Sequence, residues 1–149
     1  NQPMNNWNIN SSSEVDMFAM FQWTRKFNQP IGNWNMSKVN RTSKMFYNAK
    51  DFNQNISNWN TQNVTSMWWM FRDAQDFNNG GFTSTSNSIA KWNVSNCDNF
   101  DYMFSEAANF NIDLSDWCVS QITTTPPGFA TGSPLENQPE KHPKWGLPC

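Results

Sequence analysis

The sequence predicts an α/β repeat solenoid in which each turn of about 25 residues holds one short parallel strand and one short helix. Three recurring landmarks lead to this fold class. A Met-Phe pair recurs, a Phe-Asn pair begins six residues after the Phe of that pair, and a tryptophan recurs with an apolar residue three positions before it. Phe21, Phe46 and Phe71 are 25 residues apart. Landmarks that share one period are typical of repeat units that bury their apolar faces by stacking.

The landmarks define five units over residues 1–122, followed by a Pro-rich cap at 123–149. The Phe-Asn pairs begin at Phe27, Phe52, Phe77 and Phe110, and the repeat tryptophans are Trp7, Trp34, Trp59, Trp92 and Trp117. The first unit lacks its start, because Asn1-Gln2-Pro3 matches the sequence that follows Phe27. We therefore expect the chain to be part of a longer protein or a larger assembly.

Within one unit, the apolar pattern predicts the two elements. Phe52–Trp59 is short, with apolar residues at intervals, and is expected to form an extended strand and a turn. Val64, Met67, Met70 and Phe71 then fall at the i, i+3, i+6, i+7 spacing of a helix. Thr61 or Asn63 is placed to cap it.

Two segments depart from the pattern. Residues 79–88 form an insertion rich in Gly, Ser, Thr and Asn, which predicts a loop at one edge of the stack. In the last unit, Pro126-Pro127 stands where the helix should be. Proline excludes a helix interior, so an irregular cap is expected to cover the final turn.

The three cysteines have different predicted roles. Cys97 aligns with Val39 and Val64 and is expected to be a buried free thiol. Cys118 and Cys149 both lie near the cap, where a disulfide would close a loop of roughly 30 residues and contribute on the order of 3 kcal/mol. If it forms, it indicates an oxidising compartment.

Composition and motifs exclude several classes of function. The net charge is −2 with 15% charged residues, which is unlike a nucleic-acid-binding protein, and no apolar run approaches the ~20 residues of a membrane span. Serine hydrolase, zinc protease, P-loop and C-x-x-C motifs are missing, and His142 is the sole histidine. The spread of Cys and His shows no metal-ligand spacing. The sequence thus predicts a protein that is not an enzyme and has no cofactor.

An excess of aromatic residues gives the best indication of a partner. The core accounts for the repeat tryptophans but not for Trp23, Trp68 and Trp69. Trp68 aligns with Ser43 and Asp101, and Trp69 with Lys44 and Tyr102, so these positions are expected to face solvent. Exposed tryptophan is typical of interface anchors and sugar platforms. The candidate contact residues are Trp23, Trp68, Trp69 and Tyr102. The alternative is that the tryptophans pack against each other or a loop.

Asparagine is abundant and recurs at fixed positions of the unit. Stacked copies would place these residues in columns, where their amides can bond to the backbone of neighbouring turns. The alternative is a flat surface for ice or glycan, which we favour less. Six asparagines also match the glycosylation pattern: Asn10, Asn35, Asn40, Asn55, Asn63 and Asn93. Most of these matches are expected to be incidental.

The repeat resembles the BspA-like leucine-rich-repeat surface proteins, in the branch with units of the form F-N-Q-x-I-x-x-W-x-x-x-x-V-x-x-M-x-x-M-F. Residues 27–46 and 52–71 carry this pattern nearly whole, with Thr42 in place of the first Met. The resemblance covers residues 1 to about 122. It implies a right-handed, leucine-rich-repeat-like coil in a secreted or cell-surface protein, and many members are assumed to be adhesins. It implies no catalytic residues.

Two functions follow as expectations. The first is a non-catalytic extracellular or cell-surface binding or adhesion module with a protein or glycan partner. The second is a structural subunit or scaffold that makes protein–protein contacts inside a larger assembly.

The disulfide gives a direct test. We expect mass mapping under non-reducing conditions to recover one cross-linked peptide pair that contains Cys118 and Cys149, while Cys97 remains a thiol. A free thiol on Cys118 in protein from an oxidising compartment would refute the pairing.

Overall fold

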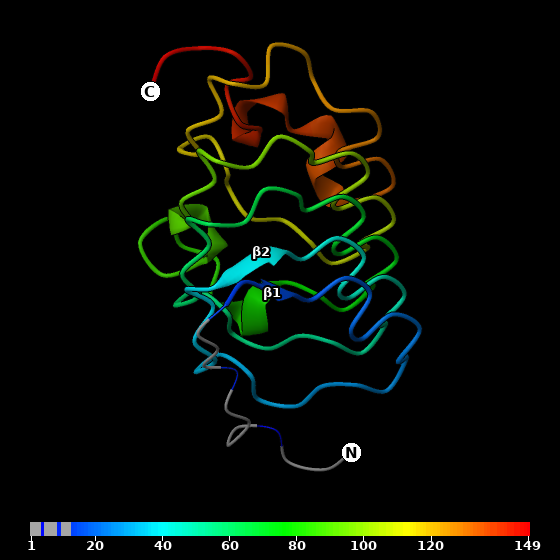
Figure 1. The fold of residues 1–149 in the computed structure, drawn as a ribbon. Coiled ribbons are helices and arrows are strands. Elements are labelled where there is room, and N and C mark those ends of the chain that lie inside the picture. The colour runs from blue at the N-terminus through cyan, green and yellow to red at the C-terminus, as the bar shows by residue number, and fades with distance from the viewer. Residues whose placement is uncertain (1–3, 5–8, 10–12) are drawn as a thin grey trace.

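The computed structural model describes Met4, Ile9 and residues 13–149. The described chain winds through successive turns that lie one above the next, ending in the C-terminal cap (Figure 1). Its regular elements are short: β1 (Val15–Asp16), β2 (Val39–Arg41), and the 3-10 helices η1 (Asn79–Gly81), η2 (Ile89–Lys91), η3 (Pro134–Asn137) and η4 (Pro139–Lys141). β1 and β2 form a two-stranded parallel sheet, and single bridges continue its direction from Arg41 to Ser66 and from Ser66 to Asn99.

The predicted fold class is wrong in its elements. The described residues contain no α-helix, and the only sheet among them is β1 with β2. An α/β solenoid with one strand and one helix in every turn is therefore not what this chain forms. The segment expected to be helical, which ends at Phe71, is built from β-turns instead.

Each of four turn segments, residues 17–24, 42–49, 67–74 and 100–107, consists of three overlapping β-turns. In residues 67–74 the N–H groups of Met70, Arg72 and Ala74 each donate to the carbonyl three residues earlier, at 3.0–3.2 Å. Trp69 and Asp73 have φ of 57° and 58°. A positive φ at the second central residue is the requirement of a type II turn. It is incompatible with an α-helix, in which every φ is near −60°.

The helical spacing in the sequence has a different cause. Met67, Met70, Phe71 and Ala74 are all buried, with at most 1% exposed. Each overlapping turn reverses the chain after three or four residues, so its inward positions also recur at i, i+3, i+4 and i+7. Apolar periodicity does not distinguish this arrangement from a helix, because both bury the same positions.

The turn segments are joined by backbone hydrogen bonds between layers. Lys44 N–H donates to Trp68 O at 2.8 Å, Phe46 N–H to Met70 O at 2.9 Å, and Asn48 N–H to Arg72 O at 2.9 Å. Equivalent bonds run from 17–24 to 42–49, from 67–74 to 100–107, and from 100–107 to residues 127–131. We call this set the ladder. In every case the N–H belongs to the earlier layer and the carbonyl to the later one, so the ladder has a direction.

Phenylalanine rings form the centre of the stack. Each layer contributes a stacked pair, such as Phe46 and Phe52 with centroids 3.9 Å apart and planes 6° apart. Phe46 also stacks on Phe71 at 5.5 Å, and Phe52 on Phe77 at 5.8 Å. Two columns of nearly parallel rings result, and Phe129 closes the first with an edge-on contact to Phe104 at 5.4 Å. Aromatic pairs of this kind stabilise the fold by about 0.5–1.5 kcal/mol beyond the gain from burying their surface.

The repeat tryptophans form a third column, whose side chains are both apolar and hydrogen-bonding. Trp34, Trp59, Trp92 and Trp117 are no more than 4% exposed. Each indole donates its Nε1–H to a carbonyl of the preceding layer, for example Trp59 to Ile31 O at 3.0 Å and Trp92 to Ile56 O at 3.2 Å. These acceptors are the apolar residues three positions before the previous tryptophan. The indole therefore supplies a donor that Phe or Leu would lack. Trp7 lies outside the described residues.

The expectation that asparagine amides bond to the backbone of neighbouring turns is confirmed for one column and wrong for the other, which bonds within its own turn. Asn28 Oδ1 accepts from Asn53 N–H at 2.9 Å, and Asn53 Oδ1 from Asn78 N–H at 2.9 Å, so one column bonds layer to layer. In the other column Asn60 Oδ1 accepts from Gln62 N–H two residues later, at 3.2 Å. The insertion is anchored by Asn79, which is fully buried and accepts from Ile56 N–H at 2.9 Å.

The cap ends the ladder. Pro127, Phe129 and Thr131 accept the last ladder bonds, from residues 102, 104 and 106. Pro127 has no N–H and cannot donate to a further layer. The N–H groups of Phe129 and Thr131 donate to Pro126 O and Gly128 O within the same segment. A disulfide joins Cys118 to Cys149, and Gly146 N–H donates to Val119 O at 3.3 Å. The ladder bonds from residues 102, 104 and 106 to residues 127, 129 and 131 cross residue 122. The boundary between array and cap at that residue stays a prediction.

The tryptophan column can be tested by replacing Trp59 with Phe. We expect Trp59→Phe to lower the free energy of unfolding by about 2 kcal/mol, because Ile31 O loses its donor and the smaller ring leaves a void. Urea denaturation measures the change. Trp68→Phe is the matched control, since Trp68 is half-buried and donates no hydrogen bond from its indole within the described residues. Equal losses in the two variants would contradict this role.

The free cysteine can be tested by alkylation. Cys97 is fully buried, and this burial raises the pKa of its thiol to about 12. The thiolate is therefore scarce at neutral pH. We expect native protein at pH 8 to leave Cys97 unmodified by iodoacetamide for hours, and unfolded protein to react within minutes. Rapid alkylation of the native protein would contradict the burial.

Candidate functional site: an aromatic strip on the turn segments

The candidate contact residues lie on the outer side of the turn segments. Trp23, Tyr47, Trp69 and Tyr102 form a continuous line of edge-to-face contacts, with ring centroids 5.1, 5.3 and 6.1 Å apart. Trp68 lies beside Trp69 at 4.9 Å. We call these five residues the aromatic strip. It crosses four layers and joins all four residues singled out from the sequence.

The overlapping turns explain why these side chains point outward. Trp23, Trp69 and Tyr102 have φ of 64°, 57° and 53°. The inward positions of the turns are taken by the buried Met and Phe residues, whereas these three side chains reach the surface. Bulky residues with positive φ cost on the order of 1–3 kcal/mol each, a cost that the surrounding fold must offset.

Cations lie over the strip. Lys44 Nζ is 4.5 Å from the centre of the Trp68 ring and 4.9 Å from that of Trp69. The guanidinium carbon of Arg72 is 4.2 Å from the Trp69 ring and 5.5 Å from the Tyr102 ring. Such contacts contribute about 0.5–1 kcal/mol each at exposed sites. The strip is thus an alternation of rings and positive charges.

Exposure differs along the strip. Trp23 is 53% exposed and Tyr102 37%, whereas Tyr47, Trp68 and Trp69 are half-buried. The two expectations for Trp68 and Trp69 are therefore each met in part: they contact one another, and they remain partly at the surface. Among the described residues, the indole N–H of Trp69 and the Nε of Arg72 are buried without a hydrogen-bond partner, although Arg72 Nε lies 3.8 Å from Asp73 Oδ2 in an ion pair. Donors left without an acceptor are unfavourable in the free protein.

Sequence reasoning missed Tyr47 and the two cations. Tyr47 aligns with Gln22, Arg72 and Ser105, which are polar. The argument that placed Trp68 at the surface therefore applied to Tyr47 as well. Lys44 and Arg72 could not be found in this way, since a cation at a solvent position is ordinary and only the stacking brings it over a ring.

A smaller cluster marks one edge of the same surface. Arg41 lies 4.6 Å from the ring centre of Phe18 and forms an ion pair of 2.6 Å with Asp16. Burial alone would raise the pKa of Asp16, but hydrogen bonds from the Arg41 guanidinium and the Phe18 N–H outweigh it and hold that pKa below its ordinary value. Asp16 is therefore charged at neutral pH and leaves Arg41 paired.

The possible glycosylation sites are distributed over other faces. Asn35, Asn63 and Asn93 are exposed, Asn40 and Asn55 are half-buried, and Asn10 lies outside the described residues. Two are less available than the pattern suggests. Asn40 Nδ2 donates to Glu14 Oε2 and Asn63 Nδ2 donates to Ser37 O, both at 2.7 Å, and glycosylation would replace these bonds. Modification of the others stays a prediction.

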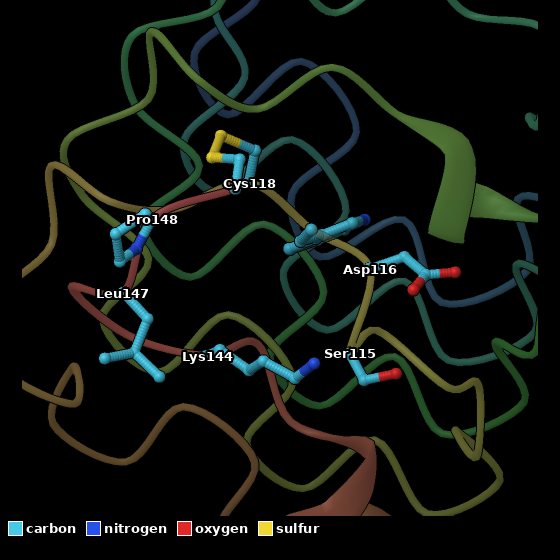
Figure 2. Close-up of a pocket in the computed structure, with 8 residues that line it drawn as sticks. Ser115, Asp116, Cys118, Lys144, Leu147 and Pro148 are labelled. Atoms are coloured by element: carbon cyan, nitrogen blue, oxygen red, sulfur yellow. A yellow bond between two sulfur atoms is a disulfide. The ribbon is translucent and has the colours of Figure 1, made fainter.

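A hollow of about 420 Å³ lies at the C-terminal end, beside the disulfide (Figure 2). Ser115, Asp116, Lys144 and Leu147 line it, and its charged side chains are Asp116 and Lys144. A hydroxyl, a carboxylate and an amine line it without a histidine or a free thiol.

The described residues provide few groups for chemistry. No cluster of three or more His, Cys, Asp or Glu side chains in this part of the chain could hold a metal ion. No helix found there has the length and hydrophobicity needed to cross a bilayer. The aromatic strip is the feature that the fold does not itself require, because the Phe and Trp columns form the core without it.

Comparison with known proteins places the chain in a family. The family model described as "Mycoplasma protein of unknown function, DUF285" matches residues 1–84 and 80–145. No curated protein and no solved structure matches the chain. The two matched regions together cover nearly the whole sequence, and they meet at the insertion. The chain therefore belongs to the DUF285 family, which is described as being of unknown function.

Proposed function

We propose that the protein is a non-catalytic binding module that contacts a partner through the aromatic strip. The observation that carries the proposal is the line of Trp23, Tyr47, Trp69 and Tyr102, interleaved with Lys44 and Arg72, on a surface that the core does not need. Trp, Tyr and Arg are the residue types most enriched in the energetic centres of protein interfaces.

The arrangement favours a protein partner over a neutral glycan. A sugar platform needs a free ring face, but Lys44 lies over Trp68 and Arg72 lies over Trp69. A protein partner can use ring edges, the exposed Trp23 and the two cations together. An acceptor supplied by the partner would also pair the indole N–H of Trp69, which has no hydrogen-bond partner among the described residues.

The location proposed for this module is extracellular, on the cell surface. The disulfide between Cys118 and Cys149 is compatible with an oxidising compartment. The resemblance to BspA-like surface proteins, many of them assumed adhesins, supports the same location, as part of this proposal. A role as a structural scaffold inside an assembly would use the same surface and is an outcome of the binding test.

The test compares three variants with the parent chain. Trp23→Ser removes the most exposed ring, and Trp68→Ser/Trp69→Ser removes the half-buried pair. Phe82→Ser is the matched control, because Phe82 is 45% exposed and belongs to the insertion rather than to the strip. Binding is measured on a glycan array and by cross-linking mass spectrometry on intact cells of the source organism.

We expect both strip variants to reduce cross-linking to the protein partner by about tenfold or more, the loss typical of a hot-spot residue, and Phe82→Ser to leave it unchanged. Thermal unfolding checks that each variant is folded. Loss of glycan binding alone would reassign the partner to a sugar. Loss of assembly into a multi-subunit complex would favour the scaffold. Equal binding by all variants would refute the role of the strip.

A further inference from the structure

The two cations over the aromatic strip have hydrogen-bond donors that no described residue accepts. Lys44 Nζ forms neither a hydrogen bond nor an ion pair with any described residue. The guanidinium of Arg72 approaches one carboxylate, that of the adjacent Asp73, and the 3.8 Å from Nε to Oδ2 is beyond hydrogen-bonding distance. Its two terminal nitrogens donate to no described residue. Two positive charges therefore lie on this surface with their donors largely unused.

The other arginine of this surface shows what a satisfied guanidinium looks like in the same protein. Arg41 donates from Nε and Nη2 to the two carboxylate oxygens of Asp16, at 3.1 and 2.6 Å, while it also lies over the Phe18 ring. A two-point contact of this kind is the strongest arrangement between a guanidinium and a carboxylate. Arg72 lies over its rings in a similar way, but no described carboxylate occupies the equivalent position.

The rings hold both cations in place for a ligand. Lys44 Nζ lies 5.8, 4.5 and 4.9 Å from the ring centres of Phe18, Trp68 and Trp69. The guanidinium carbon of Arg72 lies 4.2 Å from the centre of the Trp69 ring. A guanidinium stacked on a ring keeps its N–H groups in its own plane, where an acceptor can reach them. Long cationic side chains lose rotamer freedom when they bind, so prior stacking lowers the entropic cost of capturing an anion.

A partner that covers the strip would remove both cations from water. This step rests on the function proposed above, in which a protein contacts the strip. A charge that is buried without a counter-charge is strongly unfavourable, whereas a charge paired with a hydrogen-bonded carboxylate is tolerated. Within the described residues, Asp73 meets this need only in part for Arg72, and no group meets it for Lys44. The partner therefore has to supply acceptors, and these have to be anionic.

We propose that the partner binds through an acidic polypeptide segment, with carboxylates on Lys44 and Arg72 and an apolar side chain against Trp23. Both cations lie within 4.9 Å of the centre of one ring, that of Trp69, so closely spaced carboxylates reach both. Trp23 is 53% exposed, and no cation of a described residue lies over its ring. It offers free apolar surface next to the charged part of the strip.

The acids of the fourth layer set the direction of the bound segment. Asp101 and Glu106 belong to the same turn segment as Tyr102, and they are half-buried and exposed, respectively. A carboxylate of the partner placed at that end would be repelled by like charge. The acidic residues of the partner therefore lie over the second and third layers, and its apolar residue lies over the first.

Zero-length cross-linking on the unmodified chain tests the contact directly. A water-soluble carbodiimide activates a carboxyl group, and a lysine amine in contact with it then forms an amide bond and displaces the urea. We expect the reaction on intact cells of the source organism to join Lys44 to an aspartate or glutamate of the partner, which mass spectrometry identifies. Links that reach the partner only through other lysines, or that join Lys44 to an acidic sugar, would overturn the proposal.

Charge reversal then measures how much the cations contribute. We expect Lys44→Glu and Arg72→Glu each to weaken the affinity for the cross-linked partner by about tenfold or more in titration calorimetry, because each places a carboxylate against the partner's own. Lys91→Glu is the matched control. It changes the net charge equally, but Lys91 is exposed outside the strip and its Nζ donates to Asn58 at 3.2 Å. Thermal unfolding checks that each variant is folded, and the cross-link on the unmodified chain decides if a variant is not.

A charge swap and the strip variants separate this inference from the proposed function. Replacing the cross-linked acid of the partner by Lys should raise its affinity for Lys44→Glu by about tenfold. Binding that is lost in Trp23→Ser but kept in Lys44→Glu and Arg72→Glu would overturn the acidic segment and leave the strip as the contact surface. An unmodified chain that captures no partner, or equal binding by every variant, would overturn both.

Discussion

The structure depends on one interaction, the backbone ladder in which each turn segment gives its alternate N–H groups to the carbonyls of the next. The N–H groups between them close β-turns within the segment, as those of Met70 and Arg72 do. In residues 67–74 every N–H except that of Trp68 has a backbone partner among the described residues, although the segment forms neither a helix nor a long strand. This satisfies the requirement that buried backbone groups be hydrogen-bonded. It also fixes the spacing of the layers, because the ring columns must follow the backbone.

The side chains of the core are those that suit this spacing. The centroids of the stacked rings are 5.5–5.9 Å apart between layers and near 3.9 Å apart within one layer. Branched aliphatic side chains would not fill the space between the layers in the same way. Trp59 and its equivalents add an indole donor aimed at a carbonyl of the preceding layer. Asn53 and its equivalents bond the other side of the stack. A protein with a mean hydropathy of −0.77 can therefore bury an apolar core, because many of its polar residues form hydrogen bonds between layers.

The same backbone produces the candidate site. The turn segments contain positions with positive φ, and at three of these positions this chain has Trp23, Trp69 and Tyr102 rather than the Gly or Asn that suit them. Lys44, also at a positive φ, and Arg72 then lie over the rings. Strain accepted at the surface without a benefit to the core is the physical reason for assigning a role to the strip. The family match gives no function to set against it.

The sequence by itself determined the period, the inward positions and the residues that depart from them. Phe46, Phe71 and Trp59 are buried where the pattern places them, and the surplus of Trp68 and Trp69 is visible from aligning the repeat units alone. Only the tertiary structure decided that the Met-Phe segment is a run of β-turns, because a helix and overlapping turns bury the same i, i+3, i+4 positions. Likewise, only stacking brings Lys44 over Trp68 and joins Trp23 to Trp69 through Tyr47. Contacts between residues more than 20 positions apart depend on the register of the layers, and the backbone hydrogen bonds between layers set that register.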